Sequence, residues 1–288
     1  MLCGNRARRP VLFLLAHATG SAFRYAELLP GLSGKADVVP LDLPGHGARR
    51  GEPLLRSMEG IREDLAGQAA GALDARRGVP SPGAPPEGRE AEGGPGGRPG
   101  VNSDGAAAAA ADGGASARAG EAVGERVPYC VFGHSMGVVN GYVMTERLME
   151  SGYGPPERFF ASSFSVPGWH PIPPGMPELP DVEMWLESAA RFGVLNGQPV
   201  PSPETVESHS PVYRADLKAV EGYKPERLTA LPCPVTVVYA ESDMVDYGLA
   251  ARWEGLTPYP PEIIRVPGGH FHPLELPGQL QGILLERL

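Results

Sequence analysis

The sequence predicts an α/β fold with a mostly parallel central sheet flanked by helices. Short β-branched or apolar runs recur along the chain, and each has the composition of a strand. They cover residues 11–15, 127–132, 159–164, 233–240 and 262–266. Strands separated by helical stretches are typical of a parallel sheet. A chain of 288 residues with 42% hydrophobic residues is sufficient for one such domain, which we expect to span residues 1–288.

The first predicted elements lie at the amino-terminal end. Residues 11–15 form a strand that runs into a turn of small residues, Ala-His-Ala-Thr-Gly-Ser at 16–21. Residues 58–73 carry Leu, Ile and Ala near helical spacing, with charged side chains facing outward. This pattern predicts an amphipathic helix that covers one face of the sheet.

Residues 78–126 differ in composition from the rest of the chain. Gly, Pro and Ala make up 31 of these 49 residues, and the large apolar residues are Val79, Val101 and Val123. Such a segment cannot bury enough apolar surface to order itself, so we expect a disordered insertion before the next strand. Surface loops tolerate long insertions, and we favour an inert spacer over a docking segment.

A Gly-His-Ser-Met-Gly pentapeptide occupies residues 133–137, between the apolar runs 127–132 and 138–144. This order predicts a strand, a sharp turn and a helix. A serine hydroxyl is a weak nucleophile at neutral pH, and a strained turn with small flanking residues can expose it and activate it. The pentapeptide could arise by chance in a chain with 39 glycines, but its context favours Ser135 as a nucleophile.

Two later strands end near residues that can complete a catalytic triad with Ser135. Asp243 sits at the carboxyl end of the strand predicted at 233–240, and His270 follows the strand at 262–266 through Pro-Gly-Gly. His270 would accept the proton of the serine, while Asp243 would fix the tautomer of the imidazole and stabilise the imidazolium. We therefore predict Asp243 as the acid and His270 as the base.

Alternative residues exist at both positions. Asp246 and Glu241 flank the predicted acid, and His272 lies two residues beyond His270. We rank His272 lower because Pro273 follows it and favours an extended backbone at the preceding residue. All three alternatives are expected to be ordinary solvated loop residues.

An oxyanion hole needs two backbone donors aimed at the developing negative charge. The first donor is predicted to be the amide of Met136, the residue after the nucleophile. The second should come from the turn at 16–21, where we name Ala18 and keep Thr19 as the alternative. His17 is expected to pack beside the end of the strand rather than to line the site.

Several segments carry a family resemblance. Four of them are the turn at 17–21, Leu-Pro-Gly-His-Gly at 43–47 with Arg49 and Arg50, the turn at 132–137, and Pro-Gly-Gly-His-Phe at 267–271. A fifth, Pro-Val-Tyr-Arg-Ala-Asp-Leu at 211–217 followed by Glu-Gly-Tyr at 221–223, is more specific. Over residues 10–77 and 127–285 the chain resembles the stand-alone type II thioesterases of polyketide, nonribosomal peptide and fatty acid synthases, which belong to the α/β-hydrolase superfamily.

The resemblance implies an α/β-hydrolase fold with a helical lid. Residues 171–213 are rich in proline and in aromatic or apolar side chains, and they show no strand alternation. We favour a lid that shelters an acyl chain over an ordinary helical excursion packed on the core.

The resemblance also implies that Ser135, Asp243 and His270 act as nucleophile, acid and base. The expected substrates are acyl groups on the phosphopantetheine of acyl carrier proteins, removed for editing or for chain release, without a metal or other cofactor. The chain departs from the family at Thr19, where a second glycine is usual, and at His46, where an arginine is usual. Both departures affect the expected oxyanion geometry and substrate rather than the triad.

Charge and cysteine content exclude several classes of function. A net charge of −9 argues against a nucleic acid or an anionic membrane as partner. Docking of an acidic carrier protein would need a local positive patch, for which Arg49, Arg50, Arg56 and Arg62 are candidates. The three cysteines lack disulfide or metal spacing, and no apolar stretch approaches a membrane span, so we expect a cytoplasmic monomer.

Two other classes of function stay open. A carboxylesterase or lipase acting on oxygen esters would use the same triad. A catalytically silent binding protein could keep the hydrolase shell as a scaffold, although an intact Ser, Asp and His set argues against it.

Overall fold

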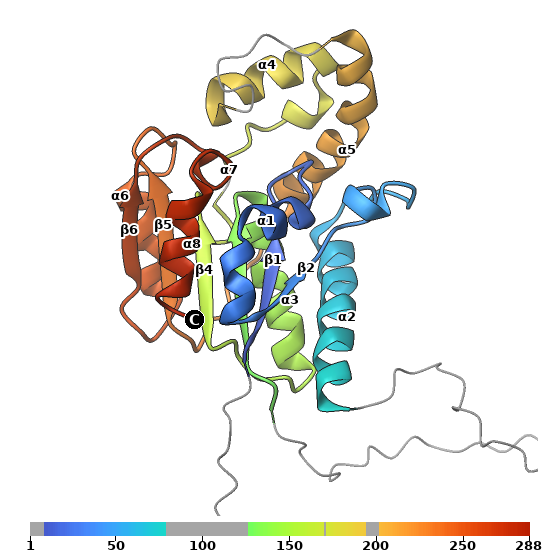
Figure 1. Ribbon diagram of the computed structural model, residues 1–288. Helices are drawn as coiled ribbons and strands as arrows, with labels where there is room; N and C mark the ends of the chain where they lie inside the picture. Colours follow the sequence, from blue (N-terminus) through green and yellow to red (C-terminus); the bar gives the residue numbers. More distant parts are fainter. Residues whose placement is uncertain (1–8, 79–125, 170, 194–201) are drawn as a thin grey trace, which may run out of the picture.

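Six parallel strands form the central sheet of the computed structural model, which describes residues 9–78, 126–169, 171–193 and 202–288. The strands within these ranges are β1 (Val11–Leu15), β2 (Asp37–Pro40), β3 (Tyr129–His134), β4 (Arg158–Ser162), β5 (Val235–Ala240) and β6 (Glu262–Val266). Their order across the sheet is β2-β1-β3-β4-β5-β6, and every pairing is parallel (Figure 1). The α/β class with a parallel sheet is therefore confirmed.

Helices connect the strands and cover the sheet. The longer ones are α1 (Ala22–Leu28), α2 (Met58–Arg77), α3 (Met136–Glu150), α4 (Asp181–Phe192), α5 (Pro203–Gly222) and α8 (Pro277–Leu285). The shorter ones are α6 (Tyr247–Ala251), α7 (His272–Glu275), and the 3-10 turns η1 (Pro30–Gly34), η2 (Gly47–Arg49), η3 (Met176–Glu178) and η4 (Arg252–Gly255). Helix α2 begins where the sequence predicts and runs one turn further, ending at Gly78 in a left-handed conformation.

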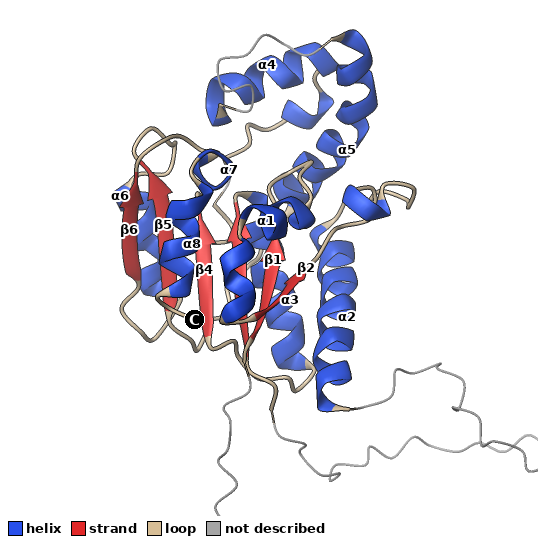
Figure 2. Ribbon diagram, in the orientation of Figure 1, coloured by secondary structure: helices blue, strands red, loops and turns tan. Residues whose placement is uncertain are grey.

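Alternate residues of each central strand face opposite sides of the sheet. Val11, Phe13 and Leu15 of β1 pack with α2 and α3, whereas Leu12 and Leu14 pack with α1 and α8. Figure 2 shows α1 and α8 in front of the strands. Burial on both faces explains why the strands are continuous apolar runs without polar alternation.

The segment predicted as a lid contains η3, α4 and the first part of α5. In Figure 1 these helices stand beyond the carboxyl ends of the strands. Helix α4 packs against α5, and an ion pair between Arg214 of α5 and Asp181 of α4 joins them. Residues 194–201 within this segment, and the predicted insertion at 78–126 except for Gly78 and Arg126, lie outside the described residues.

The carboxyl ends of β1, β3, β4, β5 and β6 meet along one edge of the sheet because all strands are parallel. The loops that follow them carry the site residues predicted from the sequence. This edge is where open α/β sheets bind their ligands. Among the described residues, no helix is long and apolar enough to cross a membrane.

Replacing Phe159 by alanine should reduce the free energy of unfolding by about 3–5 kcal/mol. Phe159 lies in β4 at the centre of the sheet, is fully buried, and stacks at 5.6 Å from Trp253. The control is Phe23→Ala on α1, because Phe23 is 48% exposed and its loss should cost no more than about 0.5 kcal/mol. Guanidinium titration followed by circular dichroism measures both, and equal effects would contradict this description of the core.

Candidate active site

Ser135 occupies a strained turn between β3 and α3. Its backbone angles are φ 55° and ψ −124°, a region that non-glycine residues rarely enter. Strain of this kind costs about 1–3 kcal/mol and persists only when the surroundings impose it. The amide of Ser135 donates a hydrogen bond to the carbonyl of Ser162 at 2.8 Å, which ties the turn to the end of β4.

Two glycines make this turn possible. A Cβ atom at Gly133 would lie 2.3 Å from the carbonyl oxygen of Gly137, and one at Gly137 would lie 2.4 Å from the carbonyl oxygen of Leu15. Both distances are far inside van der Waals contact with backbone atoms that cannot move independently. The glycines of the pentapeptide are therefore a steric requirement for bringing α3 against β1 and β3.

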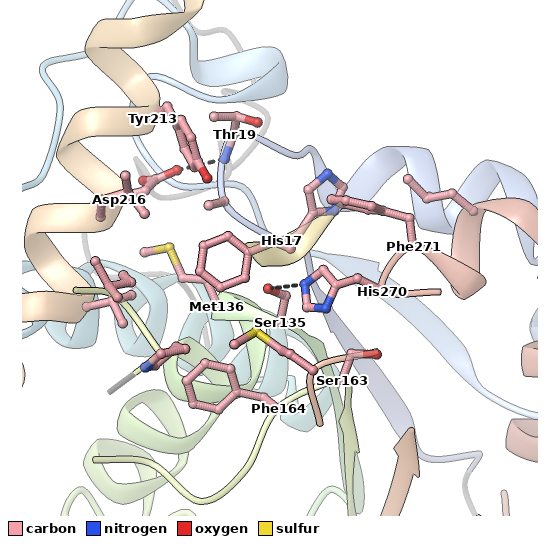
Figure 3. Close-up of a pocket in the computed structure, with 18 of the residues that line it drawn as sticks. His17, Thr19, Ser135, Met136, Ser163, Phe164, Tyr213, Asp216, His270 and Phe271 are labelled. Atoms are coloured by element: carbon pink, nitrogen blue, oxygen red, sulfur yellow. Dashed lines mark hydrogen bonds between the residues drawn. The ribbon is translucent and has the colours of Figure 1, made fainter. Parts of the chain in front are cut away.

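Hydrogen bonds through His270 link Ser135 to Asp243. The Nε2 atom of His270 is 2.9 Å from Ser135 Oγ (Figure 3). The Nδ1 atom of His270 is 2.9 Å from Asp243 Oδ1. Asp243 Oδ1 also accepts a hydrogen bond from the Met244 amide at 2.7 Å. The structure thus brings together the three residues that the sequence nominates, in the order that a serine, histidine and aspartate triad requires.

Asp243 is placed to carry a negative charge. Burial opposes its ionisation, but the hydrogen bond and the positive charge offered by His270 hold the pKa of the carboxyl group below its ordinary value. The ionised carboxylate fixes Nδ1 as the protonated nitrogen of His270. Nε2 is then left free to accept the proton of Ser135.

Three further histidines lie near His270, and nothing in the sequence indicates that they meet there. The ring centroid of His134 lies 5.3 Å from that of His270, and His17 and His272 lie within 6.0 Å of His134. Burial, together with the charge of His270, lowers the pKa of His17 to about 4. Burial lowers the pKa of His272 to about 4 as well, and that of His134 well below its ordinary value. The three rings are neutral near pH 7, so positive charge develops on His270 alone.

The alternatives to the acid and base have other roles. Glu241 forms a surface ion pair with Arg265, and Asp246 accepts a hydrogen bond from the Leu249 amide as the amino-terminal cap of α6. The expectation for His272 was wrong. It is 2% exposed and begins α7, because Pro273 is well tolerated at the first turn of a helix.

A second serine also contacts histidine. Ser162 Oγ lies 3.1 Å from His272 Nε2 and 3.0 Å from His134 Nδ1, and Ser162 is fully buried. This contact resembles the serine and histidine part of a triad. However, no described carboxylate hydrogen-bonds to either histidine, and Ser162 is not among the residues that line the cavity described below.

The backbone amides predicted for the oxyanion hole differ in whether they already donate a hydrogen bond within the protein. The Thr19 amide already donates to Asp216 Oδ2 at 2.7 Å. No described residue accepts a hydrogen bond from the amides of Ala18 or Met136. The amides of Ala18 and Met136 therefore stay available to a ligand, while that of Thr19 does not. His17 packs beside the end of β1, donating to or accepting from Tyr25, and also lines the cavity.

Asp216 and His46 form a buried pair beside the turn at 16–21, which we call the oxyanion loop. Their side chains are 2% and 4% exposed, and His46 Nε2 lies 2.9 Å from Asp216 Oδ2. His46 Nδ1 faces the Pro44 carbonyl at 3.2 Å, so both ring nitrogens have an acceptor. Burial opposes protonation of His46, but the hydrogen bond and charge of Asp216 raise its pKa above the ordinary value.

A cavity of about 430 Å³ opens at Ser135 and His270. Most of its wall is apolar. Part of this apolar wall comes from the lid and from the loop after β4. The apolar lining includes Phe164, Trp169, Ile172, Trp185, Phe192 and Val220. Its size and lining suit a small organic ligand with a long apolar part. Within the described ranges, no group of three His, Cys, Asp or Glu side chains could hold a metal ion.

Residues 115–287 match the family model described as "Thioesterase domain". The chain belongs to this family. The human "S-acyl fatty acid synthase thioesterase, medium chain" is 30% identical over 158 residues. That alignment spans 51% of this chain and 56% of the relative, so it covers little more than half of the relative's length. The predicted serine hydrolase class agrees with the family.

Several solved structures, including that of the type II thioesterase BorB, share the fold of this thioesterase. BorB from the borrelidin biosynthetic cluster is 24% identical, with a TM-score of 0.68, and the match covers 98% of this chain and 94% of BorB. ClbQ from the colibactin pathway is 19% identical, with a TM-score of 0.71 and coverage of 97% and 96%. RedJ from the prodiginine pathway of Streptomyces coelicolor is 22% identical, with a TM-score of 0.69 and coverage of 98% and 87%.

The candidate basic patch of this thioesterase is partly neutralised. Arg49 pairs with Glu52 and Asp64, and Arg62 pairs with Glu150 across α2 and α3. Arg50 and Arg56 are exposed. The number of arginines available to an acidic partner is thus smaller than the sequence suggests.

Replacing Gly137 by alanine should abolish activity and lower the free energy of unfolding by several kcal/mol, because the new Cβ would meet the Leu15 carbonyl. Gly67→Ala in the interior of α2 is the matched control. Nothing lies within 4 Å of a Cβ at Gly67, so that change should stabilise the helix by about 0.5–1 kcal/mol. Thermal unfolding of both variants tests this contrast, and a folded, active G137A enzyme would contradict it.

Replacing His46 by glutamine should destabilise the enzyme by about 3 kcal/mol at about pH 6, where it leaves Asp216 without its cation. The pKa of His46 is raised by folding, so its stabilisation is fully present below the unfolded pKa and is lost as the pH rises through the folded value. The difference between wild type and H46Q should therefore shrink by about pH 9. Urea titrations at both pH values measure it, and a difference that grows with pH would refute the assignment.

Proposed function

We propose that this chain is a serine thioesterase that hydrolyses acyl groups from the phosphopantetheine thioester of acyl carrier proteins through an acyl-Ser135 intermediate. The observation that carries the proposal is the contact of Ser135 Oγ with His270 Nε2, and of His270 with Asp243, at the floor of an apolar cavity. Membership of the thioesterase domain family supports the choice of a thioester over other esters.

Acylation begins when Ser135 Oγ attacks the thioester carbonyl and His270 Nε2 accepts the serine proton. The carbonyl oxygen becomes negative in the tetrahedral intermediate, and the amides of Ala18 and Met136 are assigned to bind it. The intermediate collapses when the carbon–sulfur bond breaks. His270 then returns its proton to the leaving sulfur, and phosphopantetheine departs as a thiol.

Deacylation repeats these steps with water as the nucleophile. His270 Nε2 takes a proton from water while the hydroxide attacks the acyl-serine carbonyl. The carbon–oxygen bond to Ser135 breaks, and Ser135 regains its proton from His270. The free acid leaves the cavity. Asp243 stays ionised throughout and stabilises the imidazolium in both halves of the reaction.

The apolar lining of the cavity favours a substrate with an acyl chain. Trp169, Trp185 and Phe192 form an aromatic part of the wall, so an extended apolar chain gains free energy by burial against them. BorB comes from the borrelidin biosynthetic cluster, and ClbQ from the colibactin NRPS/PKS pathway. A carrier-bound substrate in such a synthase, removed for editing or for chain release, is the corresponding proposal for this chain.

Wild-type enzyme should hydrolyse acyl-pantetheine thioesters faster than p-nitrophenyl esters of the same acyl length, and a fluorophosphonate probe should label it at Ser135. In the S135A variant, the rates of thioester and p-nitrophenyl ester hydrolysis should both fall by about a million-fold, as expected for removal of a triad nucleophile. Mass mapping of the labelled peptide identifies the serine that reacts.

Ser162→Ala serves as the control in this experiment because Ser162 also contacts a histidine. The folded S162A variant should still be labelled at Ser135. Labelling that survives S135A and disappears in S162A would transfer the nucleophile to Ser162. A preference for oxygen esters at every chain length would instead favour a carboxylesterase.

A further inference from the structure

Asp216 joins three parts of the chain that are distant in sequence. It lies on α5, the helix that leads from the lid to the core, and it is 2% exposed. Its Oδ2 atom accepts a hydrogen bond from the Thr19 amide at 2.7 Å and contacts His46 Nε2 at 2.9 Å. Figure 3 shows Asp216 and Thr19 facing each other above Ser135. None of the chemical steps described so far uses this carboxylate.

The hydrogen bond from the Thr19 amide attaches the oxyanion loop to Asp216. Thr19 is a β-branched residue with φ 64°, a conformation that such side chains strongly disfavour without external support. The peptide unit that ends in the Thr19 N–H begins at the Ala18 carbonyl. Fixing this unit restrains Ala18 from its carboxyl side, and the N–H of Ala18, in the preceding peptide unit, is the one assigned to the oxyanion hole.

A second buried carboxylate holds the other end of the same loop. Asp42 accepts hydrogen bonds from the Ala22 amide at 2.7 Å and from the Ser21 hydroxyl at 2.9 Å. Asp42 anchors the start of α1, whereas Asp216 anchors the part of the loop nearest to Ser135. The two carboxylates thus act on different segments of the loop.

His46 allows Asp216 to remain a buried anion. An isolated carboxylate in this position would be strongly disfavoured, and a cation at hydrogen-bonding distance offsets that cost. Both ring nitrogens of His46 face acceptors, Asp216 Oδ2 and the Pro44 carbonyl, which is the pattern of an imidazolium. Asp216 is then a fully charged acceptor for the Thr19 amide, and such bonds are stronger than neutral ones.

We propose that Asp216 is a positioning residue for the oxyanion hole: by holding the Thr19 N–H it restrains the backbone on the carboxyl side of Ala18, and so keeps the Ala18 N–H aimed at the tetrahedral intermediate. The proposal rests on the function proposed above, because it assumes acyl transfer to Ser135. Asp216 acts through Thr19 and His46 and takes no part in proton transfer. Its loss should lower kcat while leaving the acyl cavity able to bind substrate.

The test compares D216A and D216N with the wild-type enzyme on an acyl-pantetheine substrate. Loss of an oxyanion donor lowers kcat by about 10²–10³-fold, so D216A should approach that loss with KM changed by less than about threefold. D216N should fall between the two, since its amide oxygen can still accept from Thr19 without the charge. Rates are expressed per active site, counted by fluorophosphonate labelling taken to completion.

Asp74→Asn is the matched control. Asp74 is a partly buried carboxylate near the far end of α2, and it accepts a hydrogen bond from the Tyr153 hydroxyl at 2.7 Å. D74N removes the charge of a comparable hydrogen-bonded carboxylate away from the loop, so its kcat should stay within about twofold of wild type. H46Q keeps the carboxylate but removes its cation, and its kcat should lie between those of D216A and wild type.

Two results would overturn the positioning role. The first is a kcat of folded D216A or D216N within about threefold of wild type. The second is an equal loss of kcat in D74N, which would show a general effect of lost stability. Should D216A fail to fold, D216N and H46Q carry the comparison.

A different result would refute the proposed thioesterase function without testing the role of Asp216. Wild type that cleaves p-nitrophenyl esters but not thioesters would refute the thioesterase proposal alone. The same kcat comparison can then be made with the oxygen ester, because its tetrahedral intermediate uses the same donors.

Discussion

The close approach of α3 to β1 is the constraint on which the rest of the site depends. Gly137 lies so near the Leu15 carbonyl that no side chain fits between them, and this contact brings the start of α3 beside the loop that follows β1. Ser135 is forced into its positive-φ turn as a result, with its hydroxyl within reach of His270. The Met136 and Ala18 amides flank the same point because they belong to the two elements in contact. One backbone contact therefore positions the nucleophile and both proposed oxyanion donors together.

Two histidine and aspartate pairs lie near Ser135, and their surroundings give them different properties. His270 lines the cavity and contacts Ser135, the proposed nucleophile, and Asp243 hydrogen-bonds to His270 Nδ1. His46 and Asp216 are linked to the oxyanion loop instead, and His46 faces acceptors at both nitrogens. Burial keeps the remaining histidines near Ser135 uncharged. Of these two pairs, one is suited to proton transfer and the other to holding the backbone.

The departure from the related thioesterases at His46 can be understood from its contacts. Those enzymes usually carry an arginine in this loop, which is always cationic. The hydrogen bond and charge of Asp216 and the Pro44 carbonyl raise the pKa of His46 above its ordinary value, although burial opposes its protonation. A histidine here can therefore also supply positive charge to Asp216, but unlike that of an arginine its charge depends on pH. The departure at Thr19 is explained by the same carboxylate, since Asp216 supports a backbone conformation that glycine would adopt unaided.

The sequence by itself determined the parallel α/β fold, the bounds of β1 and β6, and the three residues that meet at the active site. These features are encoded locally, in apolar runs, in the glycines around Ser135, and in the polar residues that end strands. Only the tertiary structure shows that the Thr19 amide is already bonded, to a residue 197 positions away, and this contact favours Ala18 as the proposed oxyanion donor. The tertiary structure also shows that His272 is buried, although the local sequence predicts a solvated loop residue. It brings His46 into contact with Asp216, 170 residues away in the sequence. Such contacts depend on how separate elements pack, and no pattern of neighbouring residues encodes them.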